Sequence, residues 1–367
     1  MPEISKLTEL IALRGETSKT YDFGGGRRRC EISGSAVHYK DDYSNKLETW
    51  KDIDPTIVDG KVTTAPYELT VDDKKLTFRD KKTGEVSTLE LLSAKPAGLK
   101  FEIIPLNEGV SFQHILPSDK IPFEAQFKVT GNFRARAFDD VGELELETTF
   151  KDSILTEKLS QVKDRVTGQV RAAVGNIRID PTLTVESPSK DSYVVEGAGI
   201  DLNYGSGDEL WVRSYNSGDM ARRTYIEWDI SSVPSDADIT YARLGLTESN
   251  SLGNTAVSLY RITGAWTEQG ITGNTQPAVT STNKVSLGDM DDIATAVVTD
   301  QVKDARSAGT TYGVMIRTDS EHLSTARRRA YRSKEYNGND PQLYLEYTLP
   351  VVAPTVTTQA VDGIGFD

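Results

Sequence analysis

The chain contains very little cysteine and histidine. Its 367 residues include one cysteine, Cys30, and three histidines. A single cysteine cannot close a disulfide within the chain, so the fold must be stabilised without one, as in a protein made and assembled in a cytoplasm. Cys30 follows three arginines at 27–29 in a strand-like stretch, and we interpret it as a strand residue and not as a reactive thiol.

Long apolar runs are also missing. No run approaches the roughly 20 residues that a membrane-spanning helix requires, so we expect no membrane insertion. A secretory signal would combine a basic start with an apolar core. The first ten residues instead alternate charged with apolar side chains. We therefore expect that the protein is not exported through such a signal.

Positively charged residues are in the minority. Lys and Arg total 42, whereas Asp and Glu total 55, which gives a formal net charge of -13. A phosphate backbone would be repelled by this overall charge, which argues against nucleic acid as a partner. Hydrophobic residues make up 37% and charged residues 26% of the chain, a composition typical of folded proteins. The length favours two domains, each with its own core.

The sequence lacks the common catalytic and metal-binding motifs. His38, His114 and His322 are scattered and no HExxH or GxSxG motif occurs, so we predict that the protein is not an enzyme. A carboxylate pair that comes together only in the fold remains an open alternative. The acidic run 289–292 lacks the DxDxDG loop of a calcium site and favours a solvated turn or a helix start. We predict no cofactor, and a structural Ca²⁺ is left open.

What the sequence does contain is a long series of strand-like runs. Short alternating or β-branched runs bounded by Gly, Asn, Asp or Pro predict strands separated by turns. In the first half such runs lie at 67–71, 75–78, 99–104, 123–129 and 144–150. One short helix is predicted near 153–172, where apolar residues recur at spacings of three and four after a potential N-cap. These apolar residues are Leu155, Leu159, Val162, Val166 and Val170.

A polar, proline-bearing stretch at 186–190 indicates a domain boundary. We therefore predict an all-β protein with two domains. An amino-terminal β-rich domain at 1–185 would serve attachment or assembly, and an antiparallel β-sandwich of jelly-roll type would follow at 186–349. Residues 350–354 indicate a short, stiff linker.

Motifs in the carboxy-terminal half follow a specific order. They are Asp191–Gly197, Asn203–Ser206, Leu210–Val212, Arg222–Ile230, Ser258–Glu268, Thr310–Ile316, Arg332–Glu335 and Pro341–Tyr347. The ordered set resembles the DNRLRE domain family, relatives of carbohydrate-binding modules found on extracellular proteins and phage particles. Residues 37–41 and 50–55 resemble the β-rich region that precedes such modules, and 355–367 resembles the first strand of a fibronectin type III-like repeat. The resemblance implies a non-enzymatic sandwich that binds glycans.

Aromatic residues of this half are the candidate stacking groups for a sugar. A flat ring stacks on the apolar side of a pyranose while neighbouring polar groups bind its hydroxyls. The candidates are Trp266, Trp211 and Tyr204. For Trp266, at the start of a Gly- and Thr-rich loop, a core role and a ligand role are both open. Trp228 shares the parity of Ile226 and Ile230 and is predicted to be buried.

Basic residues are the second group of candidates. Arg222, Arg223, Arg332 and Lys334 could pair with an acidic polysaccharide such as a uronate chain, because a guanidinium fork suits carboxylates. Ion pairing within the protein, with acids such as Glu227, Glu335 or Glu346, is the favoured alternative for any one of them. The arginines at 327–329 add a local basic patch that could hold a polyanion or an acidic partner subunit.

These features lead to several functional hypotheses. A glycan module without a visible export signal is explained most simply by a phage particle that host lysis releases. We predict a virion structural protein, such as a tail, neck or head appendage, that contacts other virion proteins, host-surface polysaccharide and further copies of itself. The alternatives are a bacterial cell-surface carbohydrate-binding or adhesin protein, a polysaccharide-degrading enzyme component, and a sandwich used only for subunit contacts.

Overall fold

The computed structural model describes most of the chain. The described residues are 8–72, 75–92, 99–131, 133–140, 143–165, 169–184, 189–197, 199–214, 221–252, 255–287, 293–309, 311–321, 323, 327–336 and 338–350. Antiparallel strands dominate and one short α-helix occurs among these residues, α1 (Thr299–Ser307), so the predicted all-β class is confirmed. Within the described part of the chain, no helix is both long enough and apolar enough to cross a membrane.

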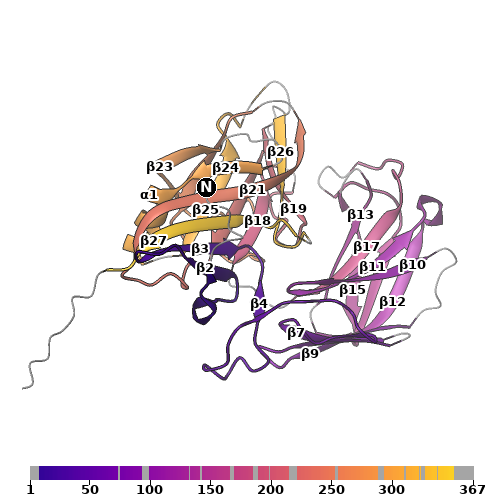
Figure 1. Ribbon diagram of the computed structural model, residues 1–367. Helices are drawn as coiled ribbons and strands as arrows, with labels where there is room; N and C mark the ends of the chain where they lie inside the picture. The colour runs from indigo at the N-terminus through magenta and orange to yellow at the C-terminus, as the bar shows by residue number, and fades with distance from the viewer. Residues whose placement is uncertain are drawn as a thin grey trace, which may run out of the picture.

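The carboxy-terminal half is a two-layered antiparallel sandwich (Figure 1). The first layer contains β1 (Thr8–Glu9), β2 (Ser18–Asp22), β3 (Arg27–Ser33), β27 (Gln342–Thr348), the first part of β21 (Asp238–Leu252) and β24 (Ile293–Val297). The second contains the rest of β21, β26 (Arg327–Arg332), β19 (Glu209–Ser214), β20 (Arg222–Trp228), β18 (Lys190–Val195), β25 (Tyr312–Thr318), β22 (Val257–Ile262) and β23 (Val279–Leu287). The register of β21 shifts near Glu248, so this one strand passes from one layer to the other.

The core of the sandwich lies between these layers. Trp228 is fully buried there, which confirms its predicted core position. Its indole N–H donates to the carbonyl of Pro341 at 3.2 Å, and its ring stacks on Tyr312 with the ring centres 5.9 Å apart. A buried indole keeps its donor satisfied in this way, which removes the main cost of burying it.

Strand β3 belongs to the sandwich although it lies near the start of the chain. It pairs with β27 in an antiparallel register that sets Cys30 opposite Leu345 and Ile32 opposite Leu343. Cys30 and Ile32 are fully buried in the same core as Trp228. The expected amino-terminal unit at 1–185 is therefore divided, because an early strand covers the sheet edge that β27 would otherwise leave open.

The second lobe is built from two further antiparallel sheets (Figure 1, purple to magenta). One has the order β15 (Glu147–Lys151), β16 (Ile154–Leu159), β12 (Phe123–Thr130), β9 (Val86–Leu91), β8 (Lys75–Asp80), β7 (Tyr67–Asp72) and β6 (Lys61–Val62). The other has the order β10 (Lys100–Leu106), β11 (Gly109–Leu116), β17 (Ile177–Thr184), β13 (Arg134–Phe138) and β14 (Glu143–Leu144). A two-stranded sheet of β4 (His38–Tyr39) and β5 (Lys51–Asp52) lies apart from both. Apolar side chains of both larger sheets form one core.

The predicted helix near 153–172 is wrong. Ile154–Leu159 is strand β16, which pairs with β12, and Leu155, Glu157 and Leu159 share its buried face. Glu157 is fully buried 3.4 Å from His114 Nδ1. This buried carboxylate interrupts the apolar alternation that marks a strand, so the two leucines appear at a helical spacing. Val166 and residues 351–367, where the fibronectin-like strand was expected, lie outside the described residues, as does the acidic run 289–292.

The pairing of β3 with β27 predicts the effect of a core substitution. Ile32→Ala should lower the free energy of unfolding by about 2–5 kcal/mol, because it removes buried apolar atoms and leaves a cavity. Three of the four tryptophans, at 211, 228 and 266, lie in the sandwich, so tryptophan fluorescence during denaturant unfolding measures this effect. Leu47→Ala, at a side chain that is 93% exposed, serves as the control. An Ile32→Ala transition equal to that of wild type would show that β3 is not part of the sandwich core.

Candidate functional site

Aromatic and basic side chains meet at β19, β20 and β26. We call Trp211, Arg213, Arg222, Arg328 and Arg332 the basic-aromatic patch. In the pairing of β19 with β26, Trp211 lies opposite Ala330 and Arg213 opposite Arg328. Strand residues alternate between the two faces of a sheet. Leu210 and Val212 are buried in the core, so Trp211 and Arg213 point to the opposite face of the sheet. Every member of the patch is half-buried.

The arginines of the patch are held by aromatic rings. The guanidinium carbons of Arg222 and Arg328 lie 5.3 Å and 5.4 Å from the centre of a Trp211 ring. Arg332 lies 4.2 Å from the Tyr336 ring centre. These distances fall within the range of cation–π attraction. Among the described residues, no carboxylate forms an ion pair with Arg222, Arg328 or Arg332.

The acids expected to neutralise these arginines have other partners. Glu227 pairs with Lys190 at 2.7 Å, and Glu346 pairs with Arg29 at 2.6 Å. Glu335 pairs with Lys334 at 2.6 Å. The structure therefore brings Trp211 and Arg222, which the sequence offered as separate candidates, into contact.

Two of the expected stacking residues do not offer a ring to a ligand. Trp266 is 7% exposed, and its indole N–H donates to Glu227 Oε2 at 2.9 Å. Tyr204 is 1% exposed and stacks on Tyr193, with the ring centres 4.3 Å apart. Both residues are covered because loops fold back onto the sheet, and a sugar-stacking role for either disagrees with this burial.

Lys334 is likewise buried and lies in an ion cluster. Its ammonium is 2.6 Å from Glu335 Oε1, 3.3 Å from Glu268 Oε1 and 3.9 Å from Glu108 Oε2. Burial opposes its charge, but the neighbouring carboxylates, led by Glu335, outweigh burial and hold the pKa of Lys334 well above its usual value. Lys334 therefore forms ion pairs within the protein, which was the favoured alternative to a contact with a ligand at the surface.

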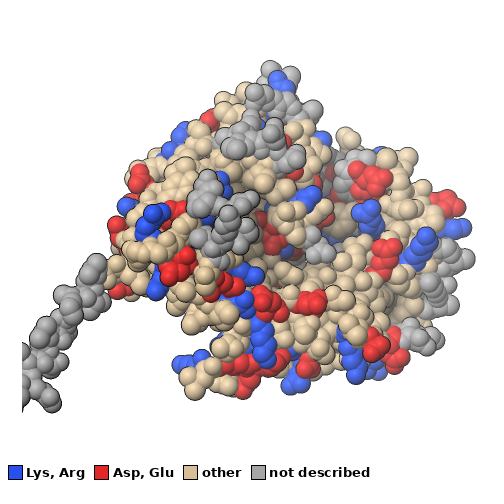
Figure 2. All heavy atoms as spheres, viewed as in Figure 1, with Lys and Arg blue, Asp and Glu red and all other residues tan. Residues whose placement is uncertain are grey.

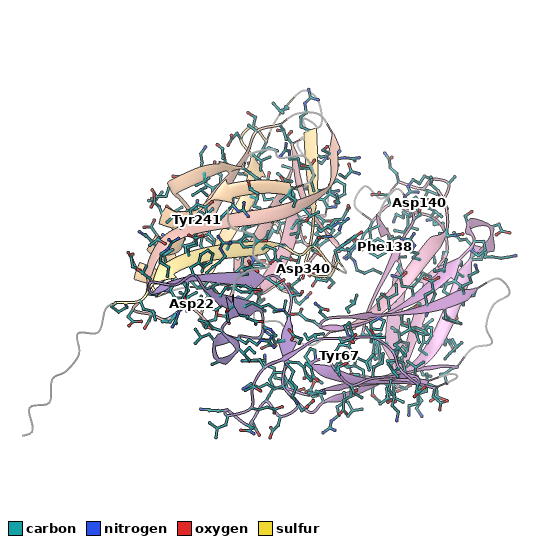
Figure 3. All side chains as sticks on the ribbon, viewed as in Figure 1. Asp22, Tyr67, Phe138, Asp140, Tyr241 and Asp340 are labelled. Carbon is teal, nitrogen blue, oxygen red and sulfur yellow. The ribbon has the colours of Figure 1, made fainter. Side chains whose placement is uncertain are left out.

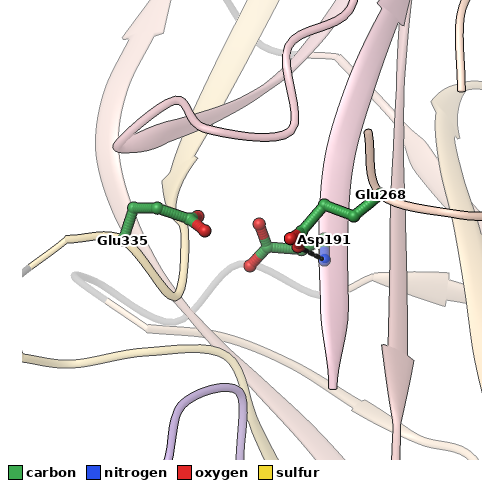
Figure 4. A group of neighbouring side chains, drawn as sticks. All are labelled: Asp191, Glu268 and Glu335. Atoms are coloured by element: carbon green, nitrogen blue, oxygen red, sulfur yellow. Dashed lines mark hydrogen bonds between the residues drawn. The ribbon is translucent and has the colours of Figure 1, made fainter. Parts of the chain in front are cut away.

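Next to Lys334 lies a group of acids that the sequence did not reveal (Figure 4). We call Asp191, Glu268 and Glu335 the acidic cluster. One carboxylate oxygen of each lies within 4.8 Å of the others. The backbone N–H of Asp191 donates to Glu268 Oε1 at 2.8 Å, and the backbone N–H of Lys334 donates to Asp191 Oδ2 at 2.8 Å. Three distant segments supply these residues, so no local motif announces them.

Burial raises the pKa values of several carboxyls in this region. Burial, with repulsion from Glu335, raises the pKa of Asp191 well above its usual value. Burial also raises the pKa of Glu268 to about 7 and that of Asp340 to about 6. Asp340 accepts hydrogen bonds from Ser33 and Ser35 at the end of β3, and it lies on the side of the sandwich next to the second lobe (Figure 3). Negative charge at this junction is therefore incompletely compensated near neutral pH.

Two cavities lie at the junction of the lobes. A small one of about 30 Å³ is lined by residues that include Ser35, Glu108, Lys334 and Asp340. A cleft of about 470 Å³ is lined by Arg136, Glu143 and Arg165 from the second lobe and by Asn203, Ser206 and Gln269 from the sandwich. In the cleft the two arginines both pair with Glu143.

The two-layered antiparallel fold of residues 190–348 is that of a carbohydrate-binding-module-type β-sandwich. The sequence model of Carbohydrate-binding module family 96 matches residues 182–347, somewhat less than half of the chain. The expected class of domain is confirmed for this segment. Comparison with curated proteins gave no match.

Solved structures add little to this assignment. The N-terminal domain of an adhesin from Streptococcus gordonii aligns over 95% of this chain and 92% of its own, at 7% identity and a TM-score of 0.21. A structure of manganese lipoxygenase from Gaeumannomyces graminis with part of zonadhesin from Komagataella pastoris aligns over 70% of this chain and 84% of that chain, at 9% identity and a TM-score of 0.16. Such scores do not indicate a shared fold.

The raised pKa of Asp340 predicts a pH dependence of stability. A carboxyl with a pKa near 6 in the folded state and about 4 in the unfolded state binds its proton more tightly when folded. Its contribution therefore falls as the pH rises from about 4 to 7, by up to about 3 kcal/mol. Denaturant unfolding at several pH values should show a smaller decline for Asp340→Asn than for wild type. If the free energy of unfolding fell equally with pH in the two proteins, the burial of the Asp340 carboxylate would be contradicted.

Proposed function

We propose that this protein binds an acidic polysaccharide without cleaving it, through the basic-aromatic patch. The observation that supports this most directly is the placement of Arg222 and Arg328 beside Trp211, without an ion-paired carboxylate in the described part of the chain. The patch lies on a domain that matches a carbohydrate-binding module family. A uronate chain carries the carboxylates that such guanidinium groups bind in a bidentate manner.

The indole of Trp211 serves in this proposal to position the arginines. An arginine side chain loses considerable conformational entropy when it binds a ligand. Cation–π contacts at 5.3 Å and 5.4 Å already restrict Arg222 and Arg328. Prior restriction lowers the entropic cost of binding. The same contacts leave the guanidinium N–H groups, and not the indole face, as the main contact for the sugar chain.

The biological setting is a further part of the proposal. The family match concerns glycan binding, so it favours an extracellular or cell-surface carbohydrate-binding or adhesin-like protein over the virion protein expected from the sequence. The virion role and the predicted self-association stay predictions. Electron microscopy with antibodies on purified phage particles addresses the first, and light scattering of the purified protein addresses the second.

Substitution of the patch arginines tests the binding proposal. Arg222→Ala and Arg328→Ala should each weaken binding of polygalacturonate about tenfold or more, since a hydrogen bond to a charged group contributes roughly 1.5–3 kcal/mol. Titration calorimetry in low salt measures the affinity, which should fall as salt is added. Neutral glucans should bind much more weakly than the polyuronate.

A matched control separates the patch from a general loss of charge. Arg243 is also half-buried and lies 5.1 Å from the Tyr344 ring centre, in the other layer of the sandwich. Arg243→Ala should leave the polyuronate affinity unchanged. Equal effects of all three substitutions, or undiminished binding by the Arg222→Ala/Arg328→Ala double variant, would reject this surface as the binding site.

A further inference from the structure

The acidic cluster contains more carboxyl groups than its one lysine can neutralise when all of them are ionised. Four carboxylates, Asp191, Glu268, Glu335 and Glu108, act electrostatically on the ammonium of Lys334. Asp191 is 1% exposed, and the side chains of Glu268 and Glu335 are 18% and 12% exposed. Water therefore screens this charge poorly, and burying unbalanced carboxylates is unfavourable.

Two oxygens of the cluster have no hydrogen-bond partner. Oδ1 of Asp191 and Oε2 of Glu335 are both buried and unpaired among the described residues. The other oxygen of Asp191 accepts from the backbone of Lys334, and Glu335 Oε1 contacts its ammonium. In Figure 4 the Asp191 carboxylate lies between those of Glu268 and Glu335. The unpaired oxygens thus belong to a group that already converges.

The spacing of the cluster suits one bound ion. Calcium binds carboxylate oxygens at roughly 2.3–2.6 Å, so two oxygens on one ion are at most about 5 Å apart. The three carboxylates of the cluster meet this limit, with ligand atoms within 4.8 Å of one another. Magnesium demands a stricter octahedron at shorter distances and retains its water. A site made of carboxylates from one strand and two separate turns fits calcium better.

We propose that Asp191, Glu268 and Glu335 bind a divalent cation of the calcium type, which joins the start of β18, the loop after Trp266 and the turn after β26. Lys334 competes with this ion, because its ammonium contacts two of the three ligands. The small cavity next to the cluster is lined by both Lys334 and Glu108, and Glu108 Oε2 lies 3.9 Å from the lysine ammonium. The site is separate from the basic-aromatic patch and does not depend on the proposed glycan.

Metal titrations of the full chain test this proposal without any glycan present. After removal of metal with EDTA, calorimetry with CaCl₂ should show one site with a dissociation constant on the order of 10⁻⁵–10⁻³ M. The melting temperature should rise with calcium, because the ion binds the folded state. MgCl₂ should bind at least about tenfold more weakly. Absence of both binding heat and a melting shift with calcium would overturn the proposal.

Two substitutions should move the affinity in opposite directions. Glu335→Gln should weaken calcium binding at least about tenfold, because it removes a charged ligand. Lys334→Met should strengthen binding several-fold and lower the melting temperature in EDTA, since the competing ammonium is lost and the acids are left uncompensated. The strengthened binding cannot arise from misfolding, so this variant keeps the test informative if Glu335→Gln fails to fold.

A control variant locates the ion. Asp238 at the start of β21 has a side chain that is 74% exposed and lies 3.9 Å from Lys303. Asp238→Asn should bind calcium as wild type does. Unchanged calcium affinity in both Glu335→Gln and Lys334→Met would place the ion elsewhere and reject the acidic cluster. Polyuronate binding is measured separately, so failure of one proposal does not decide the other.

Discussion

Hydrogen bonding of β27 to both β21 and β3 determines where the candidate sites lie. β27 is the last strand of the sandwich. Its pairing with β21 and β3 fixes the position of the residues that come just before it in the chain. These residues include β26, with the arginines of the basic-aromatic patch, and the turn with Lys334 and Glu335. The carbonyl of Pro341, just before β27, also accepts the indole N–H of Trp228 and the backbone N–H of Gly34. One segment thus connects the core, the patch and the acidic cluster.

Patterns with a short period could be predicted from the sequence, and contacts between distant segments could not. Trp228 was assigned to the core correctly, because parity along one strand decides its side. Strand β16 was mistaken for a helix, because the buried Glu157 hides the alternation. Trp266 and Tyr204 lie in loops that fold back onto the sheet, and a loop sequence does not show whether its ring faces water. The contact of Trp211 with Arg222 was not predicted, because the two residues were named only as separate candidates.

The acidic cluster shows the same limit more strongly. Asp191, Glu268 and Glu335 are separated by more than sixty residues from one another, and each is flanked by ordinary strand or turn residues. Only the packing of β18 against the loop after Trp266 and the turn after β26 joins them. The sequence offers one weak signal, because each of the three acids belongs to a motif shared with the DNRLRE family. That signal does not show that the three acids lie close together in the fold. The division of the first 185 residues by β3 is a long-range pairing of the same kind.

The net charge of the protein bears on the proposed binding of a polyanion. The formal net charge is -13, and Figure 2 shows basic and acidic side chains interspersed over one face. Electrostatic repulsion between exposed charges is screened beyond about 8–10 Å at physiological salt. A ligand at the patch therefore responds mainly to nearby groups, and Glu209 is the acid closest in the strand register, opposite Arg332. Its Oε1 accepts a hydrogen bond from Ser249, while the acids of the cluster are buried beneath the surface. Glu209 also interacts electrostatically with Arg328 and Arg222, so it offsets part of the positive charge of the patch.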